Sequence, residues 1–521
     1  MDSAHINWAS TLFNAFPYTD HATAIIVPGE EPTTISYKNM ASEILSFQIK
    51  LALLGVTVES AVSIAFPNSY EFVISFLAST SQRAIAAPLN PQYKQEEFEF
   101  YIGDLNSTLL LVPKGSFDRN TPAVRAARNF NTAIAECYWN GREMILDLKD
   151  GGKLNGKGNQ KIERARPNDI ALILHTSGTT GRPKAVPLTH RNLIKSMKNI
   201  RTTYALTSHD RSFLVMPLFH VHGLLAGFLA PLFAGGSVVI PSKFSASKFW
   251  TDFISCKANW YTAVPTIHQI LLNSSPPNPK PSIRFIRSCS SPLSPTVFHK
   301  LEEAFGAPVL EAYAMTEAAH QMTSNPLPPE KRIPGSVGMA QGVDIKIFNE
   351  NGDKVSIYEE GEICVKGENV TAGYLNNPIA NKSAFTKDGF FKTGDQGRLD
   401  ENGYLYITGR IKELINKGGE KISPIELDNV LLQHSKIDEA VSFAIPDSIY
   451  GENIAVAVVA KKNEKVTEED VKAWIKNRLA DFKVPKIVHI TDKIVKTATG
   501  KIQRRLVAEE FSRQQKIMSK L

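Results

Sequence analysis

The stretch that constrains the chain most is a short apolar run followed by a loop of small and cationic residues. Residues 170–174 read Ile-Ala-Leu-Ile-Leu, and residues 176–184 read Thr-Ser-Gly-Thr-Thr-Gly-Arg-Pro-Lys. The apolar run predicts a strand buried on both faces, so the loop leaves the end of a core strand. Backbone N–H groups, hydroxyls and cations in a glycine-rich loop form a cradle for anions. The stretch therefore predicts a polyphosphate site, although a surface loop rich in turn residues has a similar composition.

The loop differs from the Walker P-loop in its spacing. Lys184 follows Pro183 rather than glycine, and Ala185 stands where a P-loop has the Ser or Thr that binds magnesium. An ordinary P-loop NTPase is therefore disfavoured. Kinase or NTPase activity would be recognised by its products, ADP or inorganic phosphate.

Length and composition indicate a globular protein with more than one domain. The chain has 521 residues, of which 43% are hydrophobic and 21% are charged. The net charge of +7 is mild and is compatible with an anionic substrate or weak nucleic-acid contact. No aromatic recognition pattern or arginine-rich tail supports nucleic-acid binding. No apolar stretch approaches the length of a membrane span, and the N-terminus lacks the pattern of a signal peptide, so we expect an intracellular protein.

The cysteines and the last residues bear on the compartment. The cysteines are far apart in the chain: Cys137, Cys256, Cys289 and Cys364. This spacing predicts neither a zinc site nor a disulfide framework, so we expect reduced thiols. The last three residues are Ser519, Lys520 and Leu521, which match the peroxisomal address that an import receptor reads at a free C-terminus. We therefore expect the protein in the peroxisomal matrix.

The N-terminal part alternates helical patterns with short apolar strands. Residues 61–66 and 84–89 are two such strands, and the alternation predicts α/β layers around a mostly parallel sheet. Residues 147–160 are polar and glycine-rich, which predicts an exposed loop. Thr189 can cap a helix with the following residues on one apolar face: Leu193, Ile194, Met197 and Ile200.

Three further expected strands end in polar residues. Residues 213–216 lead to His220 and His222, and residues 283–291 and 309–317 each open into small polar residues. Ligands of open α/β sheets bind beyond the carboxyl ends of the strands, so we expect these ends to line one crevice. The His-x-His pair is compatible with a metal, but no third ligand lies nearby in sequence, and a lone histidine is more often structural.

The C-terminal part changes in texture after Gly338. Alternating strands with turns at Asn351-Gly352 and Asn402-Gly403 predict a small β-rich subdomain. Helix-capping patterns begin at Ser423 and at Thr467. We therefore predict an α/β protein with three parts. Residues 1–409 form a large N-terminal domain of layered α/β subdomains plus the β-rich subdomain, residues 410–412 form a hinge, and residues 413–521 form a small mobile C-terminal α/β lid.

These motifs occur together with others in one order along nearly the whole chain: residues 176–184, the strand end with His220, residues 313–317 (Tyr-Ala-Met-Thr-Glu), 393–395 (Thr-Gly-Asp), Gly409-Arg410 and 499–501 (Thr-Gly-Lys). The set resembles the adenylate-forming superfamily of acyl-CoA synthetases, aryl-CoA ligases, luciferases and peptide-synthetase adenylation domains. More narrowly, residues 311–320, 324–328 and 412–424 resemble the peroxisomal oxalate:CoA ligases of plants and fungi.

The resemblance implies a reaction in two halves that uses ATP, Mg²⁺ and CoA. A carboxylate attacks the α-phosphate of ATP to give an acyl-adenylate and pyrophosphate, and the CoA thiol then attacks the adenylate. The implied catalytic residues are Lys501, His220, Thr316 and Glu317. The implied ATP-binding residues are Thr176, Ser177, Gly178, Thr179, Thr180, Gly181, Lys184, Ser290, Tyr313, Ala314, Thr316, Asp395, Arg410 and Lys501.

The resemblance also implies individual roles. Lys501 is the cation that contacts the carboxylate and the α-phosphate, Glu317 helps to hold Mg²⁺, and Thr316 bonds the phosphate. Asp395 and Arg410 bond the ribose, and Tyr313 stacks on the adenine. Residues 176–184 become a cradle for the β- and γ-phosphates. Lys412 matches the hinge about which the lid rotates, and the loop with Gly418, Gly419 and Glu420 is presented for the thiol step.

The expected acyl pocket is more polar than in many members of that family. Where many relatives have Gly-Gly-Ala-Pro, residues 288–292 read Ser-Cys-Ser-Ser-Pro, and His222 and His320 replace an aromatic and a small residue. A large aryl or fatty tail would leave such buried groups without partners, at about 1 to 3 kcal/mol each. A short acid with a second carboxylate would satisfy them.

Our hypothesis is that the distal carboxylate of oxalate or of another small dicarboxylate is bound by His222, Ser290, Ser291 and His320, with His220 nearer the reacting carboxylate. Two alternatives remain at this point. The histidines are neutral packing residues and the substrate is an aromatic or medium-chain acid, or the protein binds nucleic acid and its ligase features are residual.

Overall fold

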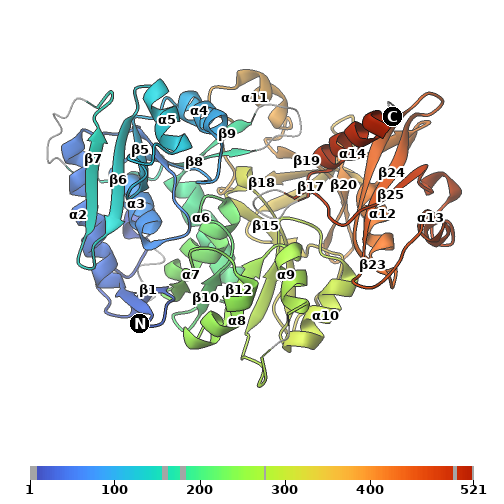
Figure 1. Ribbon diagram of the computed structural model, residues 1–521, viewed down its shortest axis with the longest axis horizontal. Helices are drawn as coiled ribbons and strands as arrows, with labels where there is room; N and C mark the ends of the chain where they lie inside the picture. Colours follow the sequence, from blue (N-terminus) through green and yellow to red (C-terminus); the bar gives the residue numbers. More distant parts are fainter. Residues whose placement is uncertain are drawn as a thin grey trace.

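The computed structural model describes residues 9–154, 162, 164–176, 183–274, 277–496 and 502–518, with the side chains described as far as residue 513 (Figure 1). These residues form sheets of nine, seven, four and five strands with helices packed around them. The prediction of a mixed α/β architecture is confirmed.

The seven-stranded sheet has the order β7-β6-β5-β3-β4-β8-β9. Its strands are β3 (Ala61–Ile64), β4 (Ile85–Pro88), β5 (Leu109–Pro113), β6 (Ala133–Trp139), β7 (Met144–Asp150), β8 (Ile170–Thr176) and β9 (Lys184–Thr189). The inner strands run parallel, whereas β7 and β9 pair antiparallel with their neighbours at the two edges. The strands predicted at residues 61–66, 84–89 and 170–174 are therefore confirmed.

Helices cover both faces of this sheet: α2 (Tyr37–Leu54), α3 (Tyr70–Ser81), α4 (Gln95–Asp104) and α5 (Pro122–Asn129). Successive residues of β5 point to opposite faces, as the period of two in a strand requires. Leu109 and Leu111 belong to the core cluster that contains Phe72 of α3. Leu110 and Val112 belong to another cluster, with α4 and α5.

The nine-stranded sheet has the order β16-β15-β14-β13-β12-β10-β11-β1-β2. Its strands are β1 (Thr23–Val27), β2 (Thr33–Ser36), β10 (Arg211–Leu214), β11 (Ser237–Val239), β12 (Trp260–Ala263), β13 (Phe285–Ser288), β14 (Val309–Met315), β15 (His320–Ser324) and β16 (Met339–Ala340). The run from β1 to β14 is parallel throughout. The carboxyl ends of β10, β12, β13 and β14 therefore lie side by side at one edge of the sheet.

The helical segments associated with this sheet are η1 (Leu12–Asn14), α6 (His190–Thr203), the π-helical η2 (His222–Leu229), α7 (Ala230–Phe233), α8 (Ala246–Ser255), α9 (Pro265–Leu272), α10 (Pro295–Phe305) and the single 3₁₀ turn η3 (Thr316–Ala318). Apolar residues of α6 and η2 share one core cluster with the seven-stranded sheet. Aromatic residues of α8 and α10 pack on the other side, against β10 and β12.

The four-stranded sheet is antiparallel in the order β17-β18-β19-β20. It consists of β17 (Asp344–Phe348), β18 (Gly361–Lys366), β19 (Phe391–Leu399) and β20 (Leu405–Arg410), with α11 (Pro378–Ala384) beside it. Gly352 and Gly403 have φ values of 86° and 80°, which supports the turns predicted at Asn351-Gly352 and Asn402-Gly403. The β-rich subdomain predicted after Gly338 is thus confirmed.

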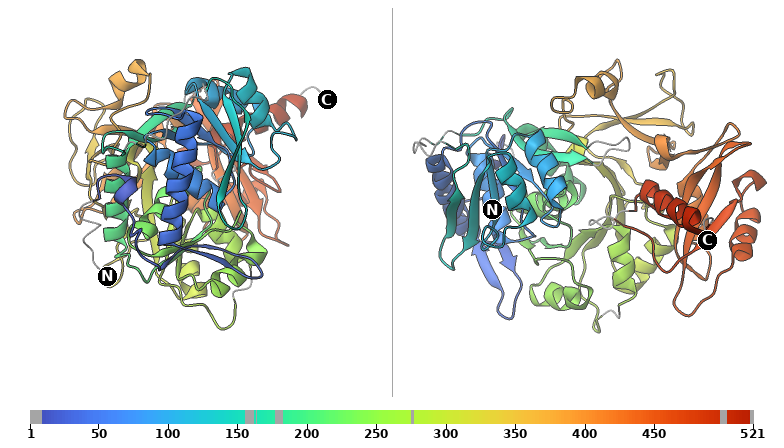
Figure 2. Two further views of the ribbon diagram at one scale, coloured as in Figure 1. Left: turned by 90° about the vertical axis from the view of Figure 1, so that its left-hand side faces the viewer. Right: turned by 45° about the horizontal axis from the view of Figure 1, so that its top comes forward.

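The C-terminal sheet has the order β22-β21-β24-β23, with β25 paired to β24. Its strands are β21 (Ile415–Lys417), β22 (Glu420–Ile422), β23 (Ile437–Asp447), β24 (Gly451–Ala460) and β25 (Ile487–Ile490), and its helices are α12 (Pro424–Leu431), α13 (Glu468–Lys476), η5 (Asp481–Lys483) and α14 (Arg504–Met518). It has an apolar core of its own. Figure 2 shows this sheet and α14, in orange and red, set apart from the blue N-terminal part in its right-hand view.

The short 3₁₀ turn η4 (Ile411–Glu413) joins the last strand of the four-stranded sheet to the first strand of the C-terminal sheet. The predicted hinge at residues 410–412 falls on this connection. Rotation about it, and the division of the chain into a large domain and a lid, stay predictions.

The predicted helix caps lie where the sequence placed them. The side chain of Thr189 accepts a hydrogen bond from the backbone of Asn192 at the start of α6. Ser423 accepts from Glu426 at the start of α12, and Thr467 forms a full capping box at the start of α13. The exposed loop predicted for residues 147–160 is wrong for residues 147–150, which belong to β7, while residues 155–160 lie outside the described part. As an edge strand, β7 tolerates polar, half-exposed residues.

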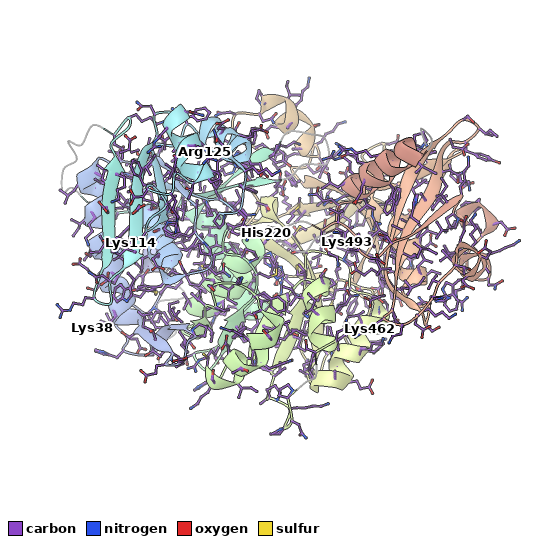
Figure 3. All side chains as sticks on the ribbon, in the orientation of Figure 1. Lys38, Lys114, Arg125, His220, Lys462 and Lys493 are labelled. Carbon is purple, nitrogen blue, oxygen red and sulfur yellow. The ribbon has the colours of Figure 1, made fainter. Side chains whose placement is uncertain are left out.

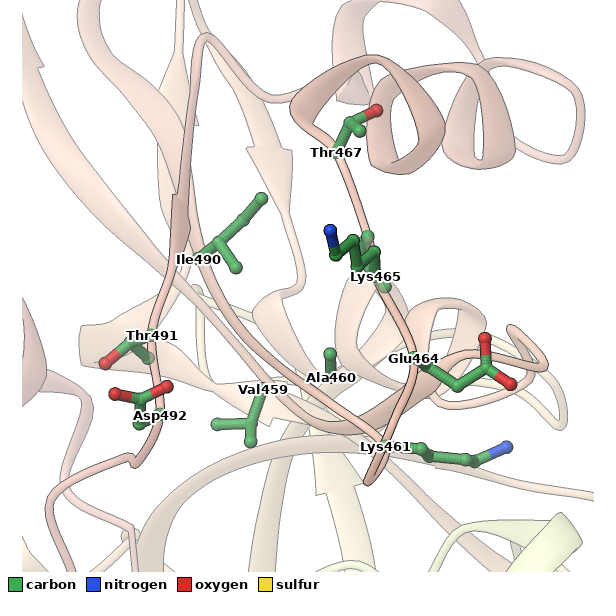
Figure 4. Close-up of a pocket in the computed structure, with 10 residues that line it drawn as sticks. Val459, Ala460, Lys461, Glu464, Lys465, Thr467, Ile490, Thr491 and Asp492 are labelled. Atoms are coloured by element: carbon green, nitrogen blue, oxygen red, sulfur yellow. The ribbon is translucent and has the colours of Figure 1, made fainter.

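All four cysteines are buried free thiols, and no described helix is long and apolar enough to cross a membrane. A groove of about 450 Å³ on the C-terminal sheet is lined by Val459, Ala460, Lys461, Glu464, Lys465, Val466, Thr467, Ile490, Thr491 and Asp492 (Figure 4). None of the expected site residues that the structure describes lines this groove.

Candidate active site

The polar strand ends predicted from the sequence meet at one edge of the nine-stranded sheet. The loop after β10 leads to His220 and His222, β13 leads to Ser290, and β14 leads to Thr316 and Glu317. Figure 3 labels His220 near the middle of the view, between the N-terminal sheets and the C-terminal sheet. The expectation of one shared crevice edge is supported by this topology.

His222 is fully buried at the first position of η2. Its Nε2 atom lies 2.6 Å from the Thr262 hydroxyl on β12, and its Nδ1 atom lies 3.0 Å from the Ser290 hydroxyl. The next residue, Gly223, has no room for a side chain, because a Cβ atom there would lie 2.2 Å from the Pro217 carbonyl oxygen. This close approach of backbone to backbone fixes the path of the chain directly after His222.

The His320 ring stacks on the His222 ring, with the centroids 5.2 Å apart and an interplanar angle of 22°. His320 is fully buried, and neither of its ring nitrogens has a hydrogen-bond partner among the described residues. Its φ of 94° is unusual for a residue other than glycine. Strain of this kind, together with unsatisfied buried nitrogens, is typical of residues held for a ligand.

Ser290 and Ser291 differ in their contacts. Ser290 is half-buried, has a φ of 75° and contacts His222. The Ser291 hydroxyl donates to the Ser290 carbonyl oxygen at 2.8 Å. The structure thus joins His222, His320 and Ser290 in direct contact and places Ser291 beside them. His220 is half-buried, and its Nδ1 atom accepts a hydrogen bond from the His222 backbone at 3.2 Å.

Arg287 is a residue of this site that the sequence reasoning missed. It lies on β13 with no exposed surface, and its Nη1 atom is 3.1 Å from the Thr262 hydroxyl. We call His222, His320, Ser290, Thr262 and Arg287 the histidine cluster. A signal was present in the sequence, because Arg287 interrupts the apolar run of a strand expected to be buried, and a buried arginine needs a partner or a function.

The two histidines of the cluster are neutral near pH 7. Burial lowers the pKa of His222 well below its ordinary value, and the positive charge of Arg287 lowers it further. Burial and Arg287 act on the pKa of His320 in the same direction. The cluster therefore carries its positive charge on the guanidinium.

The residues expected to bind the nucleoside lie together between β14 and the four-stranded sheet. The Tyr313 hydroxyl donates to Asp395 Oδ2, and Arg410 Nε lies 2.9 Å from Asp395 Oδ1. Burial and the Asp395 carboxylate raise the pKa of Tyr313 well above its ordinary value, so the hydroxyl stays a donor. Ala314 follows on the same strand, half-buried and paired with Gln321.

Thr316 and Glu317 form the 3₁₀ turn directly after β14. The carboxylate of Glu317 accepts a hydrogen bond of 3.0 Å from the Tyr374 hydroxyl. The Tyr374 ring lies 4.5 Å from the Lys184 ammonium. Tyr374 is a second residue that the sequence reasoning missed, and it connects the predicted metal ligand to the end of the phosphate loop.

Within the described residues, no group of three or more His, Cys, Asp or Glu side chains could hold a metal. Mg²⁺ is usually held by one or two carboxylates together with substrate phosphates and waters. Glu317 is a single buried carboxylate beside the ends of the phosphate loop, and this arrangement is compatible with such a Mg²⁺ site.

Several predicted residues lie outside the described part of the chain: Ser177, Gly178, Thr179, Thr180, Gly181, Lys501, Ser519, Lys520 and Leu521. The residues that flank the phosphate loop are described, and Thr176 is paired with Lys184 in the β8–β9 ladder. The loop therefore begins and ends at one place, next to Tyr374 and Glu317.

The residues predicted to serve the thiol step lie in a tight hairpin. Lys417 is paired with Glu420 across β21 and β22, and the turn between them is Gly418-Gly419, with φ values of 61° and 94°. Positive φ at both central residues is the conformation that two-residue hairpin turns favour. Lys412 is exposed in η4.

Comparison with models of known protein families shows the family of this chain. The family model described as AMP-binding enzyme matches residues 14–375, and the model described as AMP-binding enzyme C-terminal domain matches residues 426–501. The chain belongs to the AMP-binding enzyme family. The superfamily resemblance inferred from the motifs is thereby confirmed.

Individual relatives of this AMP-binding enzyme are close. It is 48% identical to the oxalate–CoA ligase of Saccharomyces cerevisiae, with 98% of both chains covered. It is 52% identical to the oxalate–CoA ligase of Arabidopsis thaliana, with 88% of this chain and 89% of that one covered. Among solved structures, ATP-bound MatB from Rhodopseudomonas palustris superposes with a TM-score of 0.88 at 29% identity, covering 96% of this chain and 99% of that one.

The arrangement of this AMP-binding enzyme separates two kinds of chemistry. Asp395, Arg410 and Tyr313 offer hydrogen bonds to a nucleoside. Lys184 offers positive charge to its phosphates, and Glu317 offers a carboxylate to a metal ion bound to them. The histidine cluster offers hydrogen-bond donors and one buried positive charge to a second, smaller ligand.

Proposed function

We propose that this enzyme is an AMP-forming oxalate:CoA ligase, which converts oxalate, ATP and CoA to oxalyl-CoA, AMP and pyrophosphate. The observation that carries the proposal is the histidine cluster at the strand ends. It gathers a buried guanidinium, a hydroxyl and neutral imidazoles at the strand ends that we expect to bind the acyl group, and a long apolar acid would leave them unsatisfied. Two relatives with the name oxalate–CoA ligase, at 48% and 52% identity, support it.

In the first half-reaction, one oxygen of the acid attacks the α-phosphorus of ATP and pyrophosphate leaves. Asp395 and Arg410 hold the ribose, and Thr316 bonds the α-phosphate as negative charge accumulates there. Glu317 would hold Mg²⁺, which neutralises phosphate charge when bound. Lys501 contributes a cation to the same transition state, and His220 lies nearer the reacting carboxylate than the cluster does.

In the second half-reaction, the CoA thiol attacks the carbonyl carbon of oxalyl-adenylate and AMP leaves. The lid turns about Lys412 in the hinge, which withdraws Lys501 and brings in the hairpin with Gly418, Gly419 and Glu420. One binding site can then serve two transition states with different charge distributions.

A substrate panel tests the proposal. Purified enzyme is supplied with ATP, Mg²⁺, CoA and one acid at a time, and AMP and pyrophosphate are measured. We expect kcat/KM for oxalate to exceed those for cinnamate and octanoate by at least about a hundredfold, which corresponds to about 2.8 kcal/mol of discrimination. Faster turnover of cinnamate or octanoate would contradict the oxalate assignment and favour an aromatic or medium-chain acid. Salt-sensitive RNA binding without AMP release would favour the nucleic-acid alternative.

We further propose that Ser519, Lys520 and Leu521 direct the enzyme to the peroxisomal matrix. They follow directly on α14, which ends at Met518. A fluorescent protein fused to the N-terminus is expected to colocalise with a peroxisomal marker, and deletion of the tripeptide to disperse it. Peroxisomal signal that survives the deletion would contradict the role of the tripeptide.

A further inference from the structure

Arg287 is a buried charge whose hydrogen-bond partners among the described residues include no counter-charge. Its Nε atom donates to the Tyr204 hydroxyl at 2.7 Å, and its Nη2 atom donates to Gln321 Oε1 at 3.2 Å. Nη1 donates to the Thr262 hydroxyl. These three acceptors are neutral, and so is His222, whose Nε2 atom lies 3.4 Å from Nη1. A guanidinium stays charged inside a protein, so a buried one without an anion is costly unless an anion arrives with the ligand.

The hydrogen bonds from Arg287 have a fixed direction. Arginine can only donate, so the Thr262 oxygen accepts from Nη1 at 3.1 Å. The Thr262 proton is then available to His222 Nε2, which lies 2.6 Å away. Arg287 Nη1 is itself 3.4 Å from the same Nε2 atom. Two donors directed at Nε2 require that this nitrogen carries no proton.

The direction continues through His222 to Ser290. A neutral imidazole without a proton on Nε2 carries it on Nδ1. Nδ1 lies 3.0 Å from the Ser290 hydroxyl oxygen, which therefore accepts. The Ser290 hydroxyl proton therefore points elsewhere. Of the residues linked by these hydrogen bonds, Ser290 is the one that is only half-buried. A ligand beside Ser290 thus meets a hydrogen-bond donor.

We propose that Arg287 and Thr262 are positioning residues for substrate specificity: they hold His222 as its neutral Nδ1-protonated tautomer, so that the Ser290 hydroxyl donates a hydrogen bond to the second carboxylate of the acid. This inference rests on the proposed function, since it needs an acid with two carboxylates. The positive charge of Arg287 favours an acid with a second negative charge. The series of hydrogen bonds from Arg287 to Ser290 provides the donor that binds this second carboxylate.

The test replaces Thr262 by valine, which has nearly the same shape and neither accepts nor donates. We expect the KM for oxalate to rise about tenfold or more, as expected for a lost hydrogen bond that supports a charged group. We expect the KM for ATP to stay within about twofold, since Thr262 is hydrogen-bonded to His222 and Arg287 and not to Tyr313, Asp395 or Arg410. Thr262→Ser restores a hydroxyl and is expected to restore the oxalate KM.

Tyr261→Phe is the matched control. It removes one hydroxyl from the neighbouring residue of β12, whose side chain points to the opposite face of the sheet from Thr262, and that hydroxyl lies 3.4 Å from His268. We expect its oxalate KM to equal that of the wild type. An unchanged oxalate KM in Thr262→Val would overturn the proposal, and so would a rise in both KM values that serine fails to reverse.

A second measurement uses Arg287→Gln and the pH dependence of binding. The wild-type oxalate KM is expected to be flat between about pH 6 and 8, because His222 stays neutral there. Burial still lowers the pKa of His222 in the variant, so its ring stays neutral and no group replaces the missing positive charge. The oxalate KM of Arg287→Gln is therefore expected to be raised by a similar factor at pH 6 and at pH 8. An unchanged oxalate KM in this variant would contradict the proposed selection of the second carboxylate by Arg287.

Failure of this inference is distinguishable from failure of the proposed function. If the wild type forms no AMP with oxalate but does so with another small dicarboxylate, the oxalate assignment is wrong, and the same variants are compared with that acid. If the wild type prefers a monocarboxylate such as glycolate to every dicarboxylate, both are wrong.

Discussion

Single side chains in the site are held by neighbours that belong to no motif. Tyr374 is the clearest case, because its hydroxyl donates to Glu317 and its ring lies under Lys184. Burial raises the pKa of Glu317, and the hydrogen bond from Tyr374 opposes that shift. The tyrosine thus favours the ionised carboxylate that a metal requires.

Tyr374→Phe is expected to raise the pKa of Glu317 further, because the stabilising hydrogen bond is lost while the burial remains. Protons then compete with Mg²⁺ for the carboxylate at higher pH, so the acid limb of the adenylation rate moves to higher pH. We expect a loss of about tenfold in kcat/KM for MgATP at the acid end, from about 1.4 kcal/mol. Pyrophosphate release as a function of pH measures it.

Tyr406→Phe is the control for this variant. Tyr406 lies on β20, and its hydroxyl is 3.3 Å from the Asp400 carboxylate. The substitution therefore also removes a tyrosine hydroxyl beside a carboxylate, but away from Glu317. Its pH profile is expected to match the wild type. If Tyr374→Phe also matches the wild type, Glu317 does not depend on this hydroxyl.

Among the structural elements, the β21–β22 hairpin has a turn that only glycine fits easily. Gly419→Ala places a Cβ atom at a φ of 94°, which costs about 1 to 2 kcal/mol. If the hairpin serves the thiol step, CoA-dependent turnover of pre-formed adenylate is expected to slow about tenfold, while ATP–pyrophosphate exchange stays unchanged. Gly403→Ala, at a φ of 80° in the turn before β20, is the control expected to leave both rates intact. Loss of exchange in Gly419→Ala would show that the hairpin acts in adenylation.

Elements whose signals are local were predictable from the sequence. The strand at residues 170–174 has a continuous apolar run, and the helix after Thr189 has both a cap and an apolar face. Residues 147–150 were wrongly predicted to form a loop. They belong to β7, which is an edge strand with one neighbour, and its polar, half-exposed residues give a sequence pattern similar to that of a loop. That distinction depends on the partner strand, which a single segment does not reveal.

The site was predictable as far as its motifs reach. His222, His320 and Ser290 were expected together and are in contact. Arg287 and Tyr374 were missed because their importance lies in tertiary contacts. Arg287 indicates a binding site for an anion only when its neighbours are known to be neutral. Tyr374 belongs to no motif, and its role follows only from its position between Glu317 and Lys184.

At the scale of the whole molecule, the predicted domain alternation depends on the segment before α14. Lys496 and Ile502 form an isolated bridge, so the ends of the segment that contains Lys501 lie close together. Arg504, at the start of α14, lies 3.3 Å from Glu413 in η4 and 2.6 Å from Asp428 in α12. The segment is thus tied through one arginine to the connection predicted to act as the hinge, so that hinge rotation and movement of Lys501 are expected to be coupled.

Lys501→Ala is expected to separate the two half-reactions. The adenylation transition state gathers negative charge at the α-phosphorus, and removal of a contacting cation is expected to lower the rate of ATP–pyrophosphate exchange by at least about a hundredfold. If the thiol step uses the lid in its other position, as predicted, conversion of supplied oxalyl-adenylate and CoA to oxalyl-CoA is expected at nearly the wild-type rate. Lys496→Ala is the control for charge and local stability. Lys496 lies at the start of the same segment, and its ammonium is 2.7 Å from the Glu439 carboxylate. Normal exchange in Lys501→Ala would remove this lysine from the adenylation step, and an equal loss in both halves would mean that it supports the lid rather than the chemistry.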